Sequence, residues 1–379
     1  MDTSQSQHWR HSAQLPLNWA ATIPTTRSQR HTSARHLDFD FPLHPAQPYQ
    51  AHSMAFSGLR RVCHVAVHAG RMQLHRWLPG CLSLLILGGC AQIPPALPLV
   101  GMAWDVNHQR MLPMSEVLQQ AGAADIVLLG ETHDNSDHHA IEVAFLEALA
   151  KNQSPVLVME QYDLEQQAAL DAVARPEQSE IARLEALQRM MGKGWEWPGY
   201  RALLAAAVHR DIPVVAANAS RNLLRQVSNQ GFTALGPGRS EALQLDTGWS
   251  AAQQTLLSSE IADGHCGSLP PEAVAAIALA QRARDAIMAD RILAHPTTPV
   301  LAILGRGHVR RDLGVPVYLG QRAGNRRFIS VGLVETAESA VASDYDNGRL
   351  GALYDFVLFT KPLIRKTDPC TAFAPTGGK

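Results

Sequence analysis

The feature that most constrains this chain is a set of short apolar runs separated by segments with helical patterns. Four runs are almost continuously apolar, as expected of β-strands buried on both faces, and they cover residues 125–130, 155–160, 212–218 and 298–305. Further strand candidates are residues 315–320, 328–335 and 354–360. Between the first two runs, residues 138–152 carry apolar side chains at helical spacing. This order of strand, helix and strand predicts a βαβ unit and a parallel sheet.

Two long stretches lack strand signals and are rich in Leu, Ala, Gln and Glu. The second of them contains a run that opens with Pro270-Pro271 and continues at helical spacing. We therefore predict an α/β fold, in which a mostly parallel sheet is flanked by helices and a smaller helical domain is inserted. The predicted core comprises residues 110–162, 211–218 and 296–365, the helical domain comprises 163–210 and 219–295, and 366–379 form a tail.

The composition is that of a globular protein, with 46% hydrophobic residues, 18% charged residues and a formal net charge of −1. This balance argues against a nucleic acid as the partner. The five cysteines form no CxxC pair, so we expect no structural zinc site. If the chain is exported, Cys266 and Cys370 either form a disulfide or remain two separate buried thiols.

Residues 72–89 have the anatomy of a secretory signal peptide. Their apolar stretch, 77–87, is shorter than the roughly 20 residues that a membrane-spanning helix needs. The sequence Leu87-Gly88-Gly89-Cys90 resembles a bacterial lipobox, in which the cysteine is lipidated. We therefore expect translation to start at Met72, with residues 1–71 an upstream or disordered extension. The alternative is a genuine N-terminal extension that contains a buried apolar helix.

On the first interpretation, the mature chain begins at the lipidated Cys90, and residues 90–109 form a tether with a Pro-rich start. The residue after the cysteine is Ala91, which resembles the pattern for sorting to the outer membrane of Gram-negative bacteria. We expect a protein that is anchored in the outer membrane only through its lipid and faces the periplasm.

Polar residues follow the apolar runs where the predicted strands end. Glu131 and His133 follow the first run, Glu160 ends the second, Asn218 ends the third and His308 follows the fourth. In open parallel sheets, ligands bind beyond the carboxyl ends of the strands. The coincidence across four strands favours a site over four unrelated turns, although Asn218 is also a common helix-capping residue.

The first and fourth ends share the spacing Gly-x-x-His, as "GETH" (130–133) and "GRGH" (305–308). Glycine allows the backbone to turn sharply and to approach a ligand closely. His133 and His308, with Glu131 or Glu160, form a plausible ligand set for Zn²⁺, Mn²⁺ or Fe²⁺. The same four residues are suited to general acid–base catalysis in a hydrolase.

These motifs support a resemblance to a known superfamily, which includes erythromycin esterases, TraB/PrgY proteins and Tiki-type proteases. Within it the chain is most similar to the ChaN-like haem-binding uptake lipoproteins, over residues of about 110–365. The segments that carry the resemblance are "LLGETHDNSDHH", "VLVMEQYD", "WEWPGYRALLAAAVHRDIPVVAANASR", "DGHCGSLPPE", "AQRARDAIMADRIL" and "ILGRGHVRRDLGVPVYL", in that order.

The resemblance implies a parallel α/β core with a smaller helical domain. It also implies a periplasm-facing protein of haem and iron uptake that binds haem, as a homodimer around paired haems with a tyrosinate on the iron. An outer-membrane haem or iron receptor is then a possible partner. The alternative function is a metal-dependent or His/Glu hydrolase of a small ester or peptide. We favour a binding protein over an enzyme.

Tyrosine is a known axial ligand of haem iron, and the expected mature chain contains Tyr162, Tyr200, Tyr318, Tyr345 and Tyr354. We rank Tyr200 above Tyr162, because Tyr200 lies beside Trp195 and Trp197, which are suited to wall a flat apolar ligand. Ordinary core packing is the alternative for Tyr200 and for both tryptophans.

Other candidates come from the loops and from the longest predicted helix. Arg310 is either a partner for a haem propionate or a surface charge, and His265 is expected to reach the site from the helical part. His138 and His139 open a helix, and we expect them at the surface. Gln281 and Asp285 share one helix face, as an interface to the core or to the pocket, although a structural hydrogen bond is the commoner role.

Overall fold

The computed structural model describes residues 99–175, 177–192, 194–195, 197–337, 340, 353–365 and 370. The predicted N-terminal extension (1–71), the signal peptide (72–89) and the lipidated Cys90 lie outside the described residues, as does Tyr345. These features stay predictions from the sequence.

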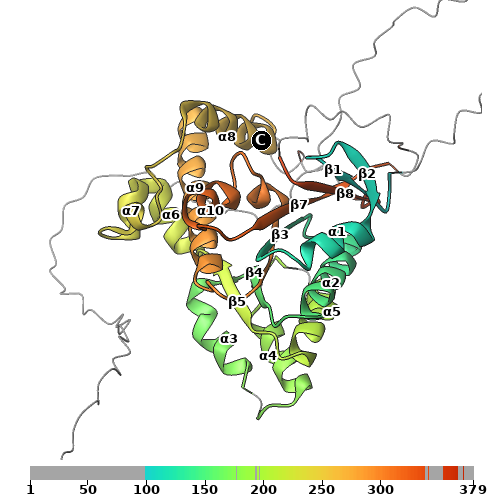
Figure 1. The fold of residues 1–379 in the computed structure, drawn as a ribbon. Coiled ribbons are helices and arrows are strands. Elements are labelled where there is room, and N and C mark those ends of the chain that lie inside the picture. Colours follow the sequence, from blue (N-terminus) through green and yellow to red (C-terminus); the bar gives the residue numbers. More distant parts are fainter. Residues whose placement is uncertain are drawn as a thin grey trace, which may run out of the picture. The chain divides into compact units, whose positions relative to one another are not determined.

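One eight-stranded sheet forms the centre of the described part, with the strand order β2-β1-β8-β7-β3-β6-β4-β5 (Figure 1). The five pairings from β8 across to β5 are parallel, whereas β1 pairs antiparallel with both β8 and β2. The mostly parallel sheet predicted from the sequence is therefore confirmed. The strands are β1 (Met102–Asp105), β2 (Arg110–Pro113), β3 (Ile126–Glu131), β4 (Val156–Asp163), β5 (Val214–Asn218), β6 (Val300–Gly305), β7 (Phe328–Glu335) and β8 (Phe356–Thr360).

Helices cover both faces of this sheet (Figure 1). One face packs against α1 (Met114–Ala121), α2 (Ser136–Ala150), α3 (Gln167–Val173), α4 (Glu180–Met190) and α5 (Trp197–His209). The other face packs against α6 (Arg221–Gln230), α9 (Pro271–Leu293) and α10 (Val315–Arg322). A short α7 (Arg239–Ala242) and α8 (Ala251–Gly264) complete the α-helices of the described part, and α8 packs on α9.

The apolar runs are explained by this two-sided covering. In β3, Val127 and Leu129 pack with α2 and α5, whereas Ile126 and Leu128 pack with α9 and α10. Successive side chains of a strand point to opposite faces, so a strand covered on both sides must be apolar at every position. The two helical stretches of the sequence, 163–210 and 219–295, lie on opposite faces of the sheet.

Two expectations about secondary structure are wrong. Residues 315–320 were expected to form a strand, but they belong to α10, where Pro316 occupies the first turn. A short apolar run does not distinguish a buried helix from a strand, and proline is tolerated at a helix start. Within the segment expected to be a tether, Met102–Asp105 forms β1, which pairs with β2 as a short antiparallel ribbon.

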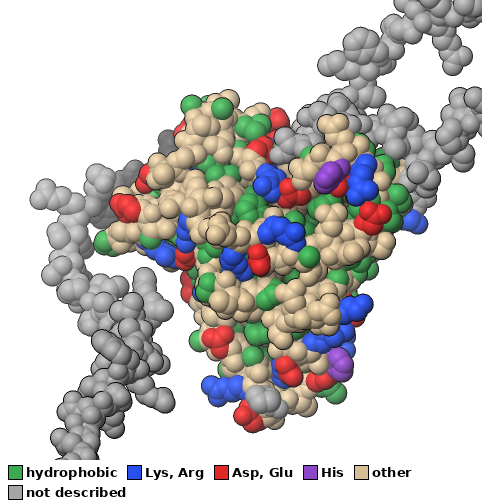
Figure 2. Space-filling view, viewed as in Figure 1, with side chains coloured by type: hydrophobic (Ala, Val, Ile, Leu, Met, Phe, Trp, Pro, Cys, Tyr) green, Lys and Arg blue, Asp and Glu red, His purple; other side chains and the backbone are tan. Residues whose placement is uncertain are grey.

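Cys266 and Cys370 form a disulfide, with their Cα atoms 5.8 Å apart, which decides between the two alternatives for these cysteines. In the described part of the chain, no helix combines the length and the apolar character needed to cross a membrane. On the face shown in Figure 2, positive and negative side chains are interspersed over the described residues.

Candidate functional site

The carboxyl ends of β3, β4 and β6 lie side by side, because β6 pairs in parallel with both other strands. This brings the residues after β3 and after β6 to one edge of the sheet. The pairing register of β4 with β5 shifts between Met159 and Asp163, the stretch that contains Glu160. The expected meeting of polar strand ends is therefore present in the fold.

The glycines of the two Gly-x-x-His loops allow the loops to pack against each other. A Cβ atom on Gly130 would collide with the Val309 side chain and would lie 3.0 Å from the Arg306 backbone. A Cβ atom on Gly305 would lie 3.0 Å from Nε2 of His133 and 3.4 Å from Oε2 of Glu160. Each loop thus leaves space for the other, which is a close approach that only glycine permits.

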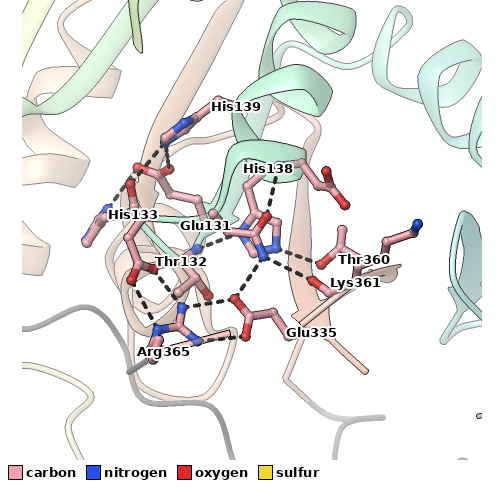
Figure 3. A network of polar contacts seen from close by, with 12 residues as sticks. Glu131, Thr132, His133, His138, His139, Glu335, Thr360, Lys361 and Arg365 are labelled. Atoms are coloured by element: carbon pink, nitrogen blue, oxygen red, sulfur yellow. Dashed lines mark hydrogen bonds and ion pairs between the residues drawn. The ribbon is translucent and has the colours of Figure 1, made fainter. Parts of the chain in front are cut away.

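Glu131 is the centre of the first group of site residues (Figure 3). Its side chain is fully buried, and its Oε1 accepts hydrogen bonds from Nδ1 of His133 at 2.8 Å, Nε2 of Gln161 at 2.8 Å and the hydroxyl of Tyr200 at 2.7 Å. Burial opposes ionisation, but the charge and hydrogen bond of His133 outweigh it and hold the pKa of Glu131 well below its usual range. The carboxylate therefore orients three side chains at once.

His133 is the more accessible of the two motif histidines, with 18% of its side chain exposed. The Trp195 ring contacts the imidazole edge-on, with 4.6 Å between the ring centroids. Burial disfavours a charged ring, but Glu131 overcomes this and raises the pKa of His133. Because Nδ1 donates to Glu131, Nε2 is the ring nitrogen that remains for a ligand.

His308 is held between two carboxylates. Its Nδ1 donates to Asp285 at 2.5 Å, and its Nε2 lies 3.4 Å from Oε1 of Glu160. The other oxygen of Glu160 accepts the backbone N–H of Gly305 at 2.7 Å. Burial opposes the charge, but the two acidic neighbours raise the pKa of His308 to about 10, and His308 in turn lowers the pKa of Glu160 against the effect of burial. At neutral pH this ring is a buried cation.

The predicted polar face of α9 meets this group. Asp285 bonds His308 directly, and the amide nitrogen of Gln281 lies 3.2 Å from its Nδ1. Gln281 and Asp285 thus share one helix face and both contact His308, the residue that follows β6.

His138 and His139 are buried, so the expectation that they lie at the surface is wrong. The Nδ1 atom of His138 accepts the Thr132 backbone N–H at 2.8 Å, so its Nε2–H donates to the hydroxyl of Thr360 at 2.9 Å. Burial lowers the pKa of His138 to about 4. His139 donates its Nε2–H to the His133 carbonyl at 3.0 Å (Figure 3). The first turn of α2 is thus folded under the loop that carries His133.

Residues of the C-terminal segment, Lys361 and Arg365, bind the loop that carries His133 (Figure 3). Arg365 pairs with Asp134 at 2.7 Å and with Glu335, at the end of β7, at 2.9 Å. The Asn135 amide also donates to Glu335 at 2.8 Å, and its Oδ1 caps α2 by accepting the Asp137 backbone N–H. Sequence reasoning missed this contribution, because no local pattern connects Arg365 with Asp134.

The structure places Tyr200 and Tyr162 in the interior. Both side chains are fully buried, and the Tyr162 hydroxyl donates to the Leu187 carbonyl at 3.1 Å. Burial raises the pKa of both phenols, and the Glu131 charge adds to this for Tyr200. Neither hydroxyl faces open space in this conformation, so their role as iron ligands stays a prediction that would require rearrangement.

The remaining candidates are Arg310, His265 and Asn218. Arg310 is buried and already paired with Glu260 at 3.0 Å and Asp312 at 2.8 Å, so it is not a solvated surface charge. His265 follows the last turn of α8 and donates its Nδ1–H to the Ile261 carbonyl at 2.7 Å. Asn218 donates to Asp163 at 3.0 Å, and Ser220 rather than Asn218 caps α6.

Residues 117–319, more than half of the chain, match the family described as "Haem-binding uptake, Tiki superfamily, ChaN". The chain belongs to this family. Among solved structures, ChaN of Campylobacter jejuni, described as showing cofacial haem binding, is similar with a TM-score of 0.57 and 20% identity. The similarity covers 69% of this chain and 97% of that one, and it confirms the fold.

A mutant of the erythromycin esterase EreC in its open conformation gives a TM-score of 0.41 and 11% identity, covering 72% of this chain and 99% of that one. No curated protein sequence gives a significant match. The family match over residues 117–319 confirms the recognition of a ChaN-like member of the superfamily.

Membership of the ChaN family supports haem as the ligand, and the donor set at the sheet edge can be compared with what haem requires. A metal-ligating histidine usually donates its other ring N–H to a carboxylate or carbonyl. His133 meets this condition through Glu131, is partly exposed and has an aromatic neighbour in Trp195. Among the described residues named as iron-ligand candidates, this imidazole fits haem iron better than the buried phenols do.

Proposed function

We propose that the protein binds haem at the edge of the sheet where the loops after β3 and β6 meet, with Nε2 of His133 as the donor to iron. The observation that carries this proposal is the family match, which spans both loops. The His133–Glu131 hydrogen bond of 2.8 Å supports the assignment, because it orients the ring and makes Nε2 more basic. Bound haem would supply the iron chemistry, and the protein would supply orientation and an aromatic neighbour.

We further propose that the protein acts in haem and iron uptake as a lipoprotein of the outer membrane that faces the periplasm. The signal-like residues 72–89 and the lipobox-like sequence that ends at Cys90 support this location. Incorporation of labelled palmitate by the wild type, and its loss in Cys90→Ala, is the expected result. Equal labelling of both proteins would contradict lipidation at Cys90.

A homodimer around paired haems is part of the same proposal. Two apolar side chains near the site are exposed, Leu363 by 37% and Ile364 by 93%. They precede Arg365, whose pairing with Asp134 places this segment beside the loop that carries His133. Burial of these side chains in a second copy would remove apolar surface from water. Sedimentation of the protein with and without haemin tests whether haem promotes dimer formation.

Haemin titration of the full chain, followed by absorbance, tests the function and names the iron donor. We expect saturable binding by the wild type and a shifted Soret band with weaker binding in His133→Ala. His209→Ala is the matched control, because His209 is an exposed histidine on α5. Tyr162→Phe, Tyr200→Phe and Tyr345→Phe test the phenols. A wild-type spectrum for His133→Ala and an altered one for a tyrosine variant would identify that tyrosine, and not His133, as the iron ligand.

A hydrolase is the second candidate function, favoured by the arrangement of Glu160, His308 and Asp285. A carboxylate, an imidazole and a second carboxylate in contact resemble the parts of an acid–base relay. Because the pKa of His308 is raised to about 10, its ring would act as a proton donor or a fixed positive charge at neutral pH. Hydrolysis of a nitrophenyl ester by the wild type but not by His308→Gln would support this function.

A further inference from the structure

The space between β3, α2 and α5 contains a cluster of buried polar atoms without hydrogen-bond partners. In the part of the chain that the structure describes, these atoms are Oε2 of Glu131, both carboxylate oxygens of Glu142, Nδ1 of His139 and Oε1 of Gln161. Buried polar atoms are nearly always bonded, and an exception often indicates a missing ion or water. Five such atoms in one place therefore require a physical explanation.

Three of these side chains converge. One ligand atom from each of Glu131, His139 and Glu142 lies within 4.8 Å of the others. The exposed fractions of these residues are 0% for both glutamates and 6% for His139. The three side chains are more buried than His133, which is 18% exposed. Glu142 lies in α2, about two helical turns after the helix begins at Ser136.

Electrostatics makes an ion-free arrangement of this group costly. Two carboxylates that are buried side by side repel each other and have lost their hydration. The three hydrogen-bond donors to this pair all bond Oε1 of Glu131. That leaves Oε2 of Glu131 and both oxygens of Glu142 without a hydrogen bond. The Nε2 atom of His139 lies 3.4 Å from Oε2 of Glu131, but its proton is donated to the His133 carbonyl.

The surrounding contacts hold the three side chains as the outer contacts of a metal site would. The three donors to Oε1 fix the orientation of the Glu131 carboxylate. His139 is fixed by the hydrogen bond of its Nε2–H to the His133 carbonyl at 3.0 Å, which leaves the unbonded Nδ1 as the ring nitrogen for an ion. Gly199 of α5 lies directly against its ring, so that a Cβ atom there would collide with the imidazole. Ligands fixed in this way bind a metal with little loss of side-chain entropy.

We propose that Glu131, His139 and Glu142 bind one divalent first-row metal ion inside the fold. One imidazole nitrogen and two carboxylates suit Mn²⁺, Fe²⁺ or Zn²⁺. The ion would neutralise the two buried carboxylates and tie α2 to β3. Glu131 would serve both sites, since it also orients His133, but the metal proposal does not depend on haem binding.

Metal analysis of the full chain tests this proposal without any activity assay. The protein is stripped with a chelator, dialysed against Mn²⁺ or Zn²⁺ in separate experiments, and its bound metal is measured. We expect one ion per chain in the wild type and affinity lower by at least about ten-fold in Glu142→Gln. Glu147→Gln is the matched control, because it makes the same change at an exposed position of the same helix.

Thermal unfolding provides a second readout that a folding defect does not mimic. We expect chelation to lower the Tm of the wild type and of Glu147→Gln, and adding Mn²⁺ or Zn²⁺ to restore it. Glu142→Gln should fold and show a Tm that does not respond to either treatment, because the amide removes the second buried charge. A response equal to that of the wild type would overturn the proposal.

Two further outcomes would also overturn it. If the wild type binds neither ion, the two carboxyls share a proton and the cluster is not a metal site. If His308→Gln abolishes binding while Glu142→Gln preserves it, the ion lies at the paired Gly-x-x-His loops. Failure of haem binding affects none of these measurements, because they are made without haem.

Discussion

The loops after β3 and β6 have the same sequence spacing, Gly-x-x-His, but their histidines lie in different environments. His133 contacts one carboxylate and leaves 18% of its side chain exposed, whereas His308 contacts two carboxylates and leaves 7% exposed. The first is therefore suited to meet a ligand from outside. The second is suited to hold three elements, β4, β6 and α9, together through a buried charge.

The glycines of the two loops also differ, in the kind of atoms that limit the space around them. The space at Gly130 is limited by the Val309 side chain and the Arg306 backbone, both parts of the opposite loop. The space at Gly305 is limited by the side-chain ends of His133 and Glu160, which can move more easily. A common motif thus serves packing in one loop and site geometry in the other.

The largest effect is expected from His308→Ala compared with His133→Ala. Removing His308 leaves Glu160 and Asp285 as buried carboxylates without their cation, which costs about 3–5 kcal/mol of unfolding free energy. Removing His133 should cost about 1–2 kcal/mol, because Glu131 keeps its bonds to Gln161 and Tyr200. Urea unfolding followed by circular dichroism measures both. Equal losses would show that the two loops are not different in the way described.

The next effect is expected at the glycines. Gly130→Ala should lower the unfolding free energy by about 1–3 kcal/mol, because the added methyl group has no space. Gly305→Ala should cost less stability but should shift the haem spectrum, because it displaces His133. Gly307→Ala is the control, since a Cβ atom there meets nothing within 4 Å. A neutral Gly130→Ala would contradict the close packing of the loops.

The pH dependence should separate His308 from His138. His308 has a pKa raised from 6.5 to about 10, so its stabilisation is complete below about pH 6.5 and is lost as the pH rises through 10. His138 has a pKa lowered from 6.5 to about 4, so its stabilisation is present above about pH 6.5 and is lost as the pH falls through 4. NMR titration of the imidazole nitrogens should show neither ring changing charge at pH 7. Titration of His308 near pH 6.5 would contradict its assignment as a buried cation at neutral pH.

The smallest effect is expected from Tyr200→Phe. It removes one donor to Glu131 and should cost about 1 kcal/mol, with the haem spectrum unchanged if His133 meets the iron. Tyr162→Phe is the matched control, because it removes a hydrogen bond to the Leu187 carbonyl and none to a site residue. Thermal unfolding and haemin titration of the two variants provide the comparison.

Short sequence patterns predicted those strands and helices whose apolar residues follow a regular spacing. The buried strands β3, β4, β5 and β6 and the helix α2 follow from runs and spacings that are visible in a few residues. The same patterns failed for α10, where six apolar residues fit a helix and a strand equally well. They also missed β1 and β2, which are four residues each and depend on pairing with β8 and with each other.

The site was predicted in its main members and missed in its connections. Glu131, Glu160, His133 and His308 were identified as strand-end residues, and the structure brings them to one edge. The burial of His138, His139 and Glu142 was not foreseen, because it depends on how α2 packs beneath the loop. Arg365 was missed for a similar reason, since its partner Asp134 is 231 positions away.

The sequence by itself determined the alternation of strands and helices, the polar strand ends and the family, because each of these is written in short patterns of side-chain type. Only the tertiary structure decided which histidine is accessible, which is a buried cation and which carboxylates lie unbonded inside the fold. Those properties depend on burial and on the nearest charges, and the nearest charges come from distant segments. Glu160 and Gly305, for example, are 145 positions apart and share a hydrogen bond.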